Sequence, residues 1–209
     1  MPQPGHHDNQ SAASGYSRHS HGLEQFFGHI DNESRLSILD LAGITQANVT
    51  FITGLGHRLY SEDFLRSLPD DLAGSDEESL ATQAGRARID RFINQSLGFP
   101  DEFFDGVLVW DILEFLSPPL LKKTVERLFR IAKPGSHLLA FFHAEEKAAS
   151  IPVYSYRIID SKTLFLIPQG MRSPVQLFNN RGIERLFQQF RSVKFFLARD
   201  HLREVIVTR

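Results

Sequence analysis

A strand–helix–strand pattern between residues 104 and 142 restricts the fold of this chain more than any other feature. Residues 104–111 form an apolar run that ends in a charged corner, and residues 138–142 form a second apolar run. Two such strands joined by a helix make a βαβ unit, which is typical of parallel α/β sheets. Ligands of these sheets bind at the carboxyl ends of the strands, so we expect chemistry near Trp110 and Asp111.

The connection between the two apolar runs is predicted to be an amphipathic helix. Ser117 and Pro118 supply an N-cap and a first-turn proline, and Gly135 ends the connection. The residues that share helical spacing behind them, and would face the core, are Leu121, Thr124, Val125, Leu128 and Phe129.

The remaining elements are predicted from apolar periodicity and turn residues. We expect strands at 37–41, 58–61 and, more weakly, 89–93, and a surface excursion at 70–83. Helices are expected at 23–27, at 46–55 and after the cap Asn179-Asn180. An inserted hairpin is expected at about 151–170, and the strands 193–198 and 204–207 should form an antiparallel pair at one edge of the sheet.

Composition divides the chain into a tail and one domain. Residues 1–22 are rich in Pro, Gly, Ser, Asn, Gln and His with almost nothing apolar, which predicts a disordered tail. A His-rich tract can bind a metal, but its histidines, His6, His7, His19 and His21, show no spacing of an ordered site, so we expect them to be solvated and expect no metal site in the chain. Residues 23–209 are long enough for one α/β domain with a substantial core.

Charge and hydropathy limit the partners. A net charge of −2 gives no reason to expect nucleic acid or an anionic membrane as a partner, and the absence of cysteine excludes disulfides and thiolate chemistry. No apolar run reaches the length of a membrane span, and the first residues lack the apolar core of a signal peptide. The expected location is therefore the cytoplasm.

The second half of the chain resembles class I S-adenosylmethionine-dependent methyltransferases, and the resemblance extends over residues 23–209. The residues that carry it are Phe104, Asp105, Val107, Leu113 and Leu116, followed by Lys133-Pro134-Gly135 before the next strand. The resemblance implies a three-layer Rossmann-like α/β sandwich with a mostly parallel seven-stranded sheet and a C-terminal antiparallel strand pair. It also implies S-adenosylmethionine as cofactor and a small-molecule methyl acceptor.

The first motif of this family, an acid followed by a glycine-rich loop, is only partly present. Asp40 supplies the acid, whereas Ala42, Ile44 and Gln46 occupy the glycine positions and Gly43 is off register. The resemblance assigns Asp40, Ala42 and Gly43 to the cofactor, although Asp40 is equally suited to cap the following helix. A β-branched residue resists positive φ, so Ile44 is expected to crowd the methionine end of the pocket.

Further cofactor contacts are assigned by position. Asp63 follows Asp40 by 23 residues, which suits the acid that binds the ribose hydroxyls, with Glu62 as its near competitor. Phe64 is placed to pack on an adenine face. Asn94 maps to the third cofactor position, where the family usually has an acid.

Residues at the ends of two strands are the candidates for contact with the methyl acceptor. Trp110 is assigned to the cofactor or to core packing, and Asp111 to orientation of a substrate amine or hydroxyl or to a cap. His143, at the carboxyl end of the fifth strand, is the best-placed general base. The hairpin with Tyr154 and Tyr156 would form either a substrate lid or a homodimer contact.

Two functions remain open from the sequence. The leading hypothesis is a methyltransferase, in which the protein mainly supplies proximity and, where needed, proton removal. The alternative is a catalytically inactive methyltransferase-like protein that serves in binding or assembly, suggested by the missing glycines. An NAD-dependent dehydrogenase is a weaker third option, because a Gly-x-Gly-x-x-Gly fingerprint is also missing.

Overall fold

A six-stranded sheet forms the centre of the protein. The computed structural model describes residues 15–30, 33, 35–73, 76–145, 147–197 and 201–209. The strand order is β3 (Arg58–Ser61), β2 (Ser37–Asp40), β4 (Phe104–Trp110), β5 (Ala132–His143), β9 (Leu202–Thr208) and β8 (Ser192–Leu197). The first four strands are parallel, and β9 is antiparallel to both of its neighbours. The predicted antiparallel pair at the C-terminal end is confirmed.

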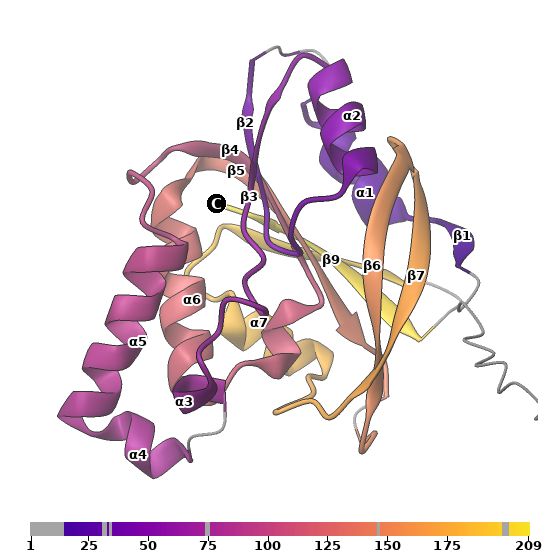
Figure 1. Cartoon of the computed structure of the whole chain (residues 1–209). Coiled ribbons are helices and arrows are strands. Elements are labelled where there is room, and N and C mark those ends of the chain that lie inside the picture. The colour runs from indigo at the N-terminus through magenta and orange to yellow at the C-terminus, as the bar shows by residue number, and fades with distance from the viewer. Residues whose placement is uncertain (1–14, 31–32, 34, 74–75, 146, 198–200) are drawn as a thin grey trace, which may run out of the picture.

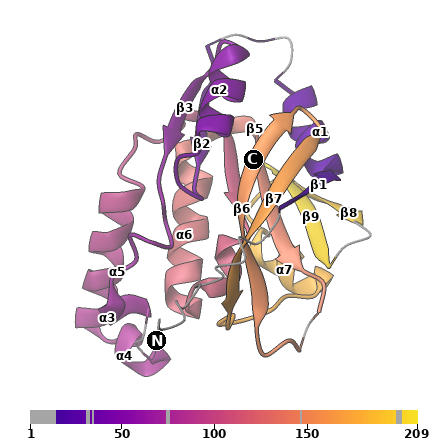
Figure 2. The same cartoon turned by 45° about the vertical axis from the view of Figure 1, so that its right-hand side comes forward.

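A second sheet lies over one face of the first. It has three antiparallel strands in the order β1 (Tyr16–His19), β7 (Thr163–Arg172) and β6 (Ile151–Asp160). The predicted hairpin is therefore present as β6 and β7. Figures 1 and 2 show this long hairpin in front of the central sheet, beside α2 (Gln46–Gly54). The helix α1 (His21–Gly28) covers the same face.

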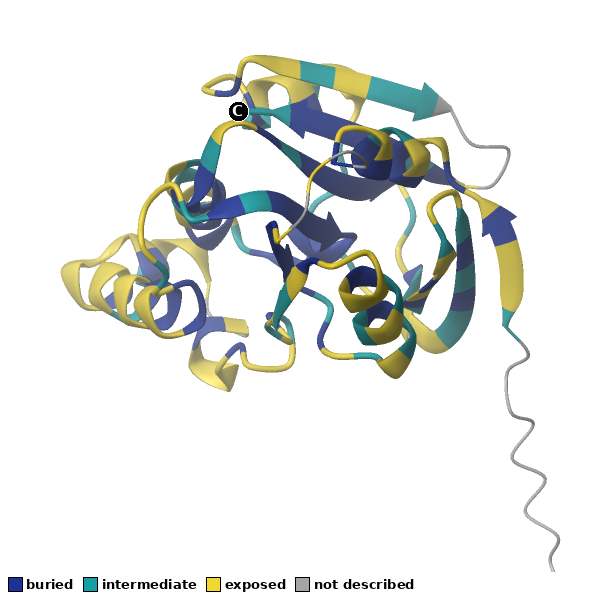
Figure 3. Ribbon diagram, turned by 90° about the horizontal axis from the view of Figure 1, so that it is seen from above, coloured by how far each residue is buried: buried dark blue, intermediate teal, exposed yellow. Residues whose placement is uncertain are grey.

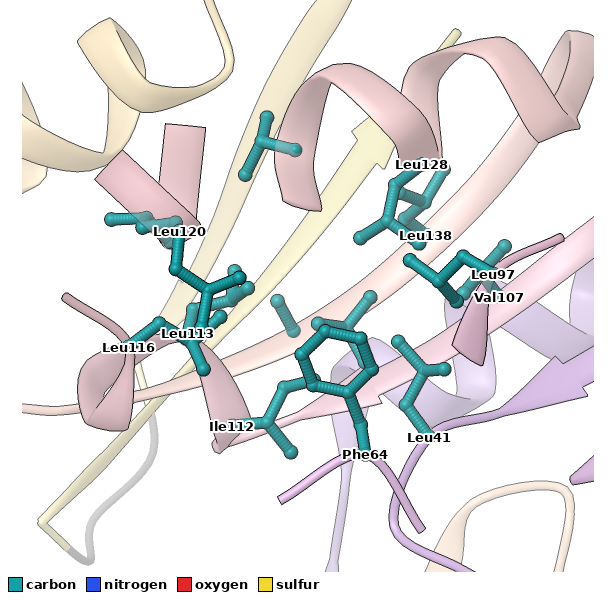
Figure 4. Close-up of a cluster of buried hydrophobic side chains, with 14 of the residues drawn as sticks. Leu41, Phe64, Leu97, Val107, Ile112, Leu113, Leu116, Leu120, Leu128 and Leu138 are labelled. Atoms are coloured by element: carbon teal, nitrogen blue, oxygen red, sulfur yellow. The ribbon is translucent and has the colours of Figure 1, made fainter. Parts of the chain in front are cut away.

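The helices of the opposite face are α5 (Gln83–Ser96), α6 (Pro118–Ile131) and α7 (Asn180–Leu186), with the short surface helices α3 (Asp70–Ala73) and α4 (Glu77–Ala81) nearby. The central sheet thus separates two hydrophobic cores, because successive side chains of a strand point to opposite faces. Val107 and Val109 pack toward α5 and α6, whereas Leu108 and Trp110 pack toward α1 and the hairpin. Figure 3 shows the buried strands between exposed outer helix faces, and Figure 4 shows the core beneath α6.

A close contact between α1 and β4 requires a glycine. A Cβ added to Gly106 would lie 2.6 Å from Cζ of Phe26 and 3.1 Å from Cδ1 of Ile38. Both side chains are fully buried and have no free space to move into. Gly106, in the apolar run that first indicated the fold, therefore sets how closely the helix layer approaches the sheet.

The predicted strand at 89–93 is wrong, because these residues lie within α5. Ile89, Phe92 and Ile93 are buried on one side of that helix, at the i, i+3 and i+4 positions. A short apolar run fits a strand or a helix equally well, and the flanking residues here extend the helical pattern in both directions. The described part of the sheet consequently has six strands where the resemblance implied seven.

The predicted boundary of the disordered tail is also wrong, since residues 15–22 belong to the folded domain. Arg18 forms a buried ion pair with Glu204 in β9. Ser20 caps α1 by accepting a hydrogen bond from the backbone N–H of Leu23 at 3.1 Å, and its hydroxyl donates to Glu204 at 3.0 Å. Residues 1–14 of the expected tail lie outside the described residues.

The other elements agree with the sequence pattern. Asn179 caps α7 by accepting a hydrogen bond from the N–H of Gly182 at 2.8 Å. Ser117 holds the N-cap position of α6, but its side chain makes no capping hydrogen bond. Among the described residues, no helix is long and apolar enough to cross a membrane.

Candidate functional site

A cleft of about 760 Å³ lies at the carboxyl ends of β2, β3 and β4, beneath the β6–β7 hairpin. Its volume is in the range of small-molecule and cofactor sites. Its wall combines the loop after β2, the end of β3, the corner after β4 and one side of the hairpin. The lining residues are Leu41, Ala42, Gly43, Ile44, Thr45, Ser61, Asp63, Leu65, Arg66, Asp111, Ile112, Val153, Tyr154, Ser155, Gln169 and Arg172.

The loop after β2 is held against the end of β3 by its backbone. The N–H of Gly43 donates to the carbonyl oxygen of Glu62 at 3.2 Å, and Ala42 forms an isolated bridge with Asp63. Gly43 has φ +84°, and an added Cβ would lie 3.1 Å from both Cβ and Oδ2 of Asp63. A glycine is therefore needed here both for the turn and for the close approach of the acid.

The expected obstruction by Ile44 is not present in the form we predicted. Ile44 is 75% exposed and lies at the mouth of the cleft. Its φ is not positive, because the positive φ of this loop belongs to Gly43. The family's glycine register is shifted by one residue, and the β-branched side chain avoids the conformation it resists.

Asp40 lies behind the cleft wall, where it binds three parts of the protein. Its Oδ1 accepts hydrogen bonds from Nε1 of Trp110 at 2.7 Å and from the N–H of Ala42 at 3.1 Å. Its Oδ2 accepts from Nδ2 of Asn48 in α2 at 2.9 Å. Burial raises the pKa of Asp40, and these hydrogen bonds oppose the rise. The acid of the first motif thus supports the loop and does not line the cleft.

Trp110 is wholly buried and stacks on Tyr156 of the hairpin, with ring centroids 4.8 Å apart and 6° between the planes. Its backbone has φ +57°, a conformation that non-glycine residues seldom adopt. The turn redirects the chain from β4 into Asp111 and the short 3₁₀ helix η1 (Ile112–Phe115). Of the two roles expected for Trp110, core packing is the one seen.

Asp111 is the acidic group that the corner presents to the cleft. It lines the cleft although only 3% of its surface is exposed, and its Oδ2 makes no hydrogen bond of normal geometry. Burial raises the pKa of Asp111 to about 6, against the lowering effect of the Tyr156 hydroxyl and of His143. A carboxyl group with such a pKa can accept or release a proton near neutral pH.

His143 forms a buried pair with Glu114, a residue that the sequence analysis did not single out. Nδ1 of His143 lies 2.6 Å from Oε2 of Glu114, and the His143 backbone N–H donates to both carboxylate oxygens at 3.1 and 3.2 Å. Burial raises the pKa of Glu114, and the hydrogen bond from His143 opposes this. Nε2 of His143 is buried without a hydrogen-bond partner and does not line the cleft.

Besides Asp40 and Trp110, three further predicted cofactor residues lie away from the cleft. Phe64 is fully buried in the core against Phe92, so it has no free face for an adenine. The Glu62 carboxylate accepts a hydrogen bond from Ser67 at 2.9 Å and does not line the cleft. Asn94 lies in α5 and lines a different depression, between α5 and α6. Of the two acids considered for the ribose, Asp63 is thus the one that lines the cleft.

The hairpin contributes cleft residues for which the sequence gave only a general expectation. Tyr154 and Ser155 come from β6, and Gln169 and Arg172 from β7. The guanidinium carbon of Arg172 lies 5.0 Å from the ring centroid of Phe115. Their position over the cleft agrees with the lid interpretation of the hairpin, and the dimer interpretation stays a prediction.

Comparisons with known proteins show which solved structures share this fold. Neither a protein-family model nor a curated protein sequence matches the chain. Among solved structures it is similar to a 1,6-didemethyltoxoflavin N1-methyltransferase from Burkholderia thailandensis, with 11% identity, 90% of this chain and 76% of that chain covered, and a TM-score of 0.51. It is also similar to a SAM-dependent methyltransferase from Archaeoglobus fulgidus, with 14% identity, coverage of 90% and 91%, and a TM-score of 0.50. The fold is that of class I S-adenosylmethionine-dependent methyltransferases.

The pKa of Asp111 predicts how stability depends on pH. The folded-state pKa of about 6 lies above the ordinary aspartate pKa of 3.8, so the folded state binds this proton more tightly. The protonated Asp111 carboxyl stabilises the folded state. This contribution is complete below about pH 4 and is lost as pH rises through 6. The Asp111→Asn variant should therefore gain stability relative to the wild type between about pH 4 and pH 7, by on the order of 3 kcal/mol.

Urea denaturation of both proteins across this pH range measures the difference. Asp90→Asn removes an exposed carboxylate on α5, whose Oδ1 lies 3.4 Å from Nζ of Lys123, and serves as the control for the loss of one carboxyl group. A constant difference between Asp111→Asn and the wild type across the range would contradict the raised pKa.

Proposed function

We propose that the protein is an S-adenosylmethionine-dependent methyltransferase that acts on a small-molecule acceptor. The observation that carries this proposal is the cleft, in which Gly43 and Asp63 meet at the carboxyl ends of the parallel strands. The fold supports it, because the similar Burkholderia enzyme is described with S-adenosylhomocysteine and its small-molecule substrate bound.

The residues of the cleft fit this cofactor. The Asp63 side chain is exposed in the wall and can accept hydrogen bonds from both ribose hydroxyls, as acids at this position do in nucleotide sites. Arg66 and Arg172 offer guanidinium groups for the carboxylate of the methionine moiety. When bound, the cofactor would supply an electrophilic methyl group.

The acceptor side needs proximity and, for a protic nucleophile, removal of a proton. We assign removal of the proton from the nucleophile to Asp111, because this residue lines the cleft and has a pKa of about 6. His143 and Glu114 lie behind it, and a positive charge on His143 lowers the pKa of Asp111. The role of His143 is then to take up the proton of Asp111 at Nε2, after which the charge on His143 stabilises the Asp111 carboxylate.

The hairpin supports an acceptor of small size. Tyr154 and Gln169 line the cleft from the hairpin side, and its volume of about 760 Å³ suits the cofactor together with a small acceptor. A cytoplasmic location and a homodimer formed through the hairpin stay predictions from the sequence.

Replacement of Asp63 tests the placement of the cofactor. Asp63→Ala should weaken the binding of S-adenosylhomocysteine by about 10–100-fold, because two charge-assisted hydrogen bonds to the ribose are lost. Isothermal titration calorimetry with S-adenosylmethionine and S-adenosylhomocysteine measures this. Glu62→Ala is the matched control, since the adjacent carboxylate turns toward Ser67 and should leave affinity unchanged.

Calorimetry on the wild type also separates the two functions that the sequence left open. No binding of either compound at millimolar concentration would refute the enzyme proposal and favour a role in binding or assembly. Equal losses of affinity in the Asp63 and Glu62 variants would refute the assignment of Asp63 to the ribose.

Two glycines with the same backbone conformation test the loop. Gly43 and Gly56 both have φ +84°, so an alanine costs similar strain at each, roughly 1–2 kcal/mol. Only at Gly43 would the new Cβ meet Asp63, whereas at Gly56 nothing lies within 4 Å. Gly43→Ala should weaken S-adenosylhomocysteine binding by about 10-fold or more, while Gly56→Ala lowers only the melting temperature.

The measurements are calorimetric titration and thermal denaturation of both variants. Equal affinities in the two variants would mean that the contact between Gly43 and Asp63 has no part in cofactor binding.

The proposed role of His143 depends on which of its ring nitrogens carries the proton. Glu114 should hold the proton on Nδ1, which leaves Nε2 free to accept one. Glu114→Gln should release this constraint and produce a mixture of tautomers. Long-range ¹H–¹⁵N correlation spectra of the imidazole report the tautomer directly, and Glu126→Gln on α6 is the control.

A proton on Nε2 in the wild type at neutral pH would refute the role of His143 as a proton acceptor. An unchanged tautomer in Glu114→Gln would refute the positioning role of Glu114.

A further inference from the structure

Three potential metal ligands meet at the junction between β1 and α1, away from the cleft. They are His19, at the end of β1, and His21 and Glu24, in the first turn of α1. Nε2 of His19 lies 3.1 Å from Nδ1 of His21 and 3.2 Å from Oε2 of Glu24. Nδ1 of His21 lies 3.8 Å from Oε2 of Glu24. The three atoms thus form a small triangle.

The dimensions of this triangle match a first coordination shell. Two ligands on a tetrahedral Zn²⁺, each about 2.1 Å from the metal, lie roughly 3.4 Å apart. The three distances of 3.1, 3.2 and 3.8 Å lie on either side of this value. Two imidazoles and one carboxylate are also a ligand set that zinc sites use, with the fourth position left to water.

The backbone that carries these ligands is fixed by other contacts. His19 is paired with Thr163 in the three-stranded sheet, and the N–H of Ser20 donates to the carbonyl oxygen of Lys162 at 2.8 Å. Ser20 itself is fully buried and caps α1. The turn between the two histidines is therefore rigid, which reduces the entropy that metal binding must overcome.

The side chains of the three ligands are accessible from solvent. The exposed fractions of the side chains are 43% for His19, 60% for His21 and 52% for Glu24, so an ion can enter without opening the fold. The rings of Phe196 and His21 lie with their centroids 6.4 Å apart and 23° between their planes.

We propose that His19, His21 and Glu24 form a binding site for a divalent transition metal of the zinc type. A bound ion would connect β1 to α1, and β1 is an outer strand of the sheet whose other two strands line the cleft. The site is independent of the proposed methyltransferase activity. It differs from the sequence expectation, in which the histidines of this region were solvated and no metal was present.

Zinc titration of the full chain tests the proposal. His6 and His7 lie outside the described residues and are first replaced by alanine, so that they do not contribute ligands. In this background, calorimetry should give one Zn²⁺ per chain, and Co²⁺ should give the visible absorption of a tetrahedral site. His19→Ala and His21→Ala should each weaken Zn²⁺ binding by more than about 10-fold, and Mg²⁺ should not compete, because it prefers oxygen ligands.

His201→Ala is the matched control. Nδ1 of this exposed histidine lies 3.3 Å from Oε1 of Glu145, and no third ligand group lies near them among the described residues. It should leave the zinc affinity unchanged. Zn²⁺ should also raise the melting temperature of the background protein and not that of His21→Ala, whose metal-free melting temperature confirms that it folds. Equal zinc affinity in the background protein and in the His19 and His21 variants would overturn the proposal, as would loss of the site in His201→Ala.

Discussion

The buried carboxylate of Asp40 connects the layers on which the cleft depends. It accepts hydrogen bonds from the indole of Trp110 at the end of β4, from the loop after β2 and from Asn48 in α2. Hydrogen bonds to a charged group contribute about 1.5–3 kcal/mol each, and an unpaired buried charge is costly. Asn48 extends the connection to the hairpin, since it donates to the carbonyl oxygen of Tyr156 and accepts from the N–H of Ile158. One acid thereby connects the loop, the helix and the hairpin.

This arrangement separates the support of the cleft from its chemistry. Both carboxylate oxygens of Asp40 accept hydrogen bonds from the protein interior. Asp63 and Asp111, in contrast, both line the cleft. Trp110 links the two functions, because its indole binds Asp40 while its positive φ turns Asp111 toward the cleft. The stacking of Tyr156 on Trp110 then sets the height of the hairpin above the sheet.

The sequence predicted the parts of this structure that depend on local patterns and on spacing along the chain. The β4–α6–β5 unit follows from apolar periodicity and turn residues, and Asp63 was found from its distance to Asp40 in a strand–loop–helix–strand unit. The failures depend on contacts between distant segments. The ion pair between Arg18 and Glu204 joins residues 186 positions apart and brings residues 15–22 into the fold. Asn94 was misplaced because the strand expected before it is part of a helix, and Glu114 could be suspected only as an acid within an apolar run.

The missing glycines of the first motif are weaker evidence against cofactor binding than the sequence alone suggests. The family's glycines provide positive φ and close approach of the loop to its neighbours. Here both needs fall on one residue, Gly43, which has φ +84° and where an added Cβ would lie only 3.1 Å from the side chain of Asp63. Ala42 is paired with Asp63 by its backbone, and Ile44 is directed to the mouth of the cleft. A single glycine, shifted by one position, is therefore sufficient to bring the loop and the acid together, and the loop retains the geometry on which the proposed activity depends.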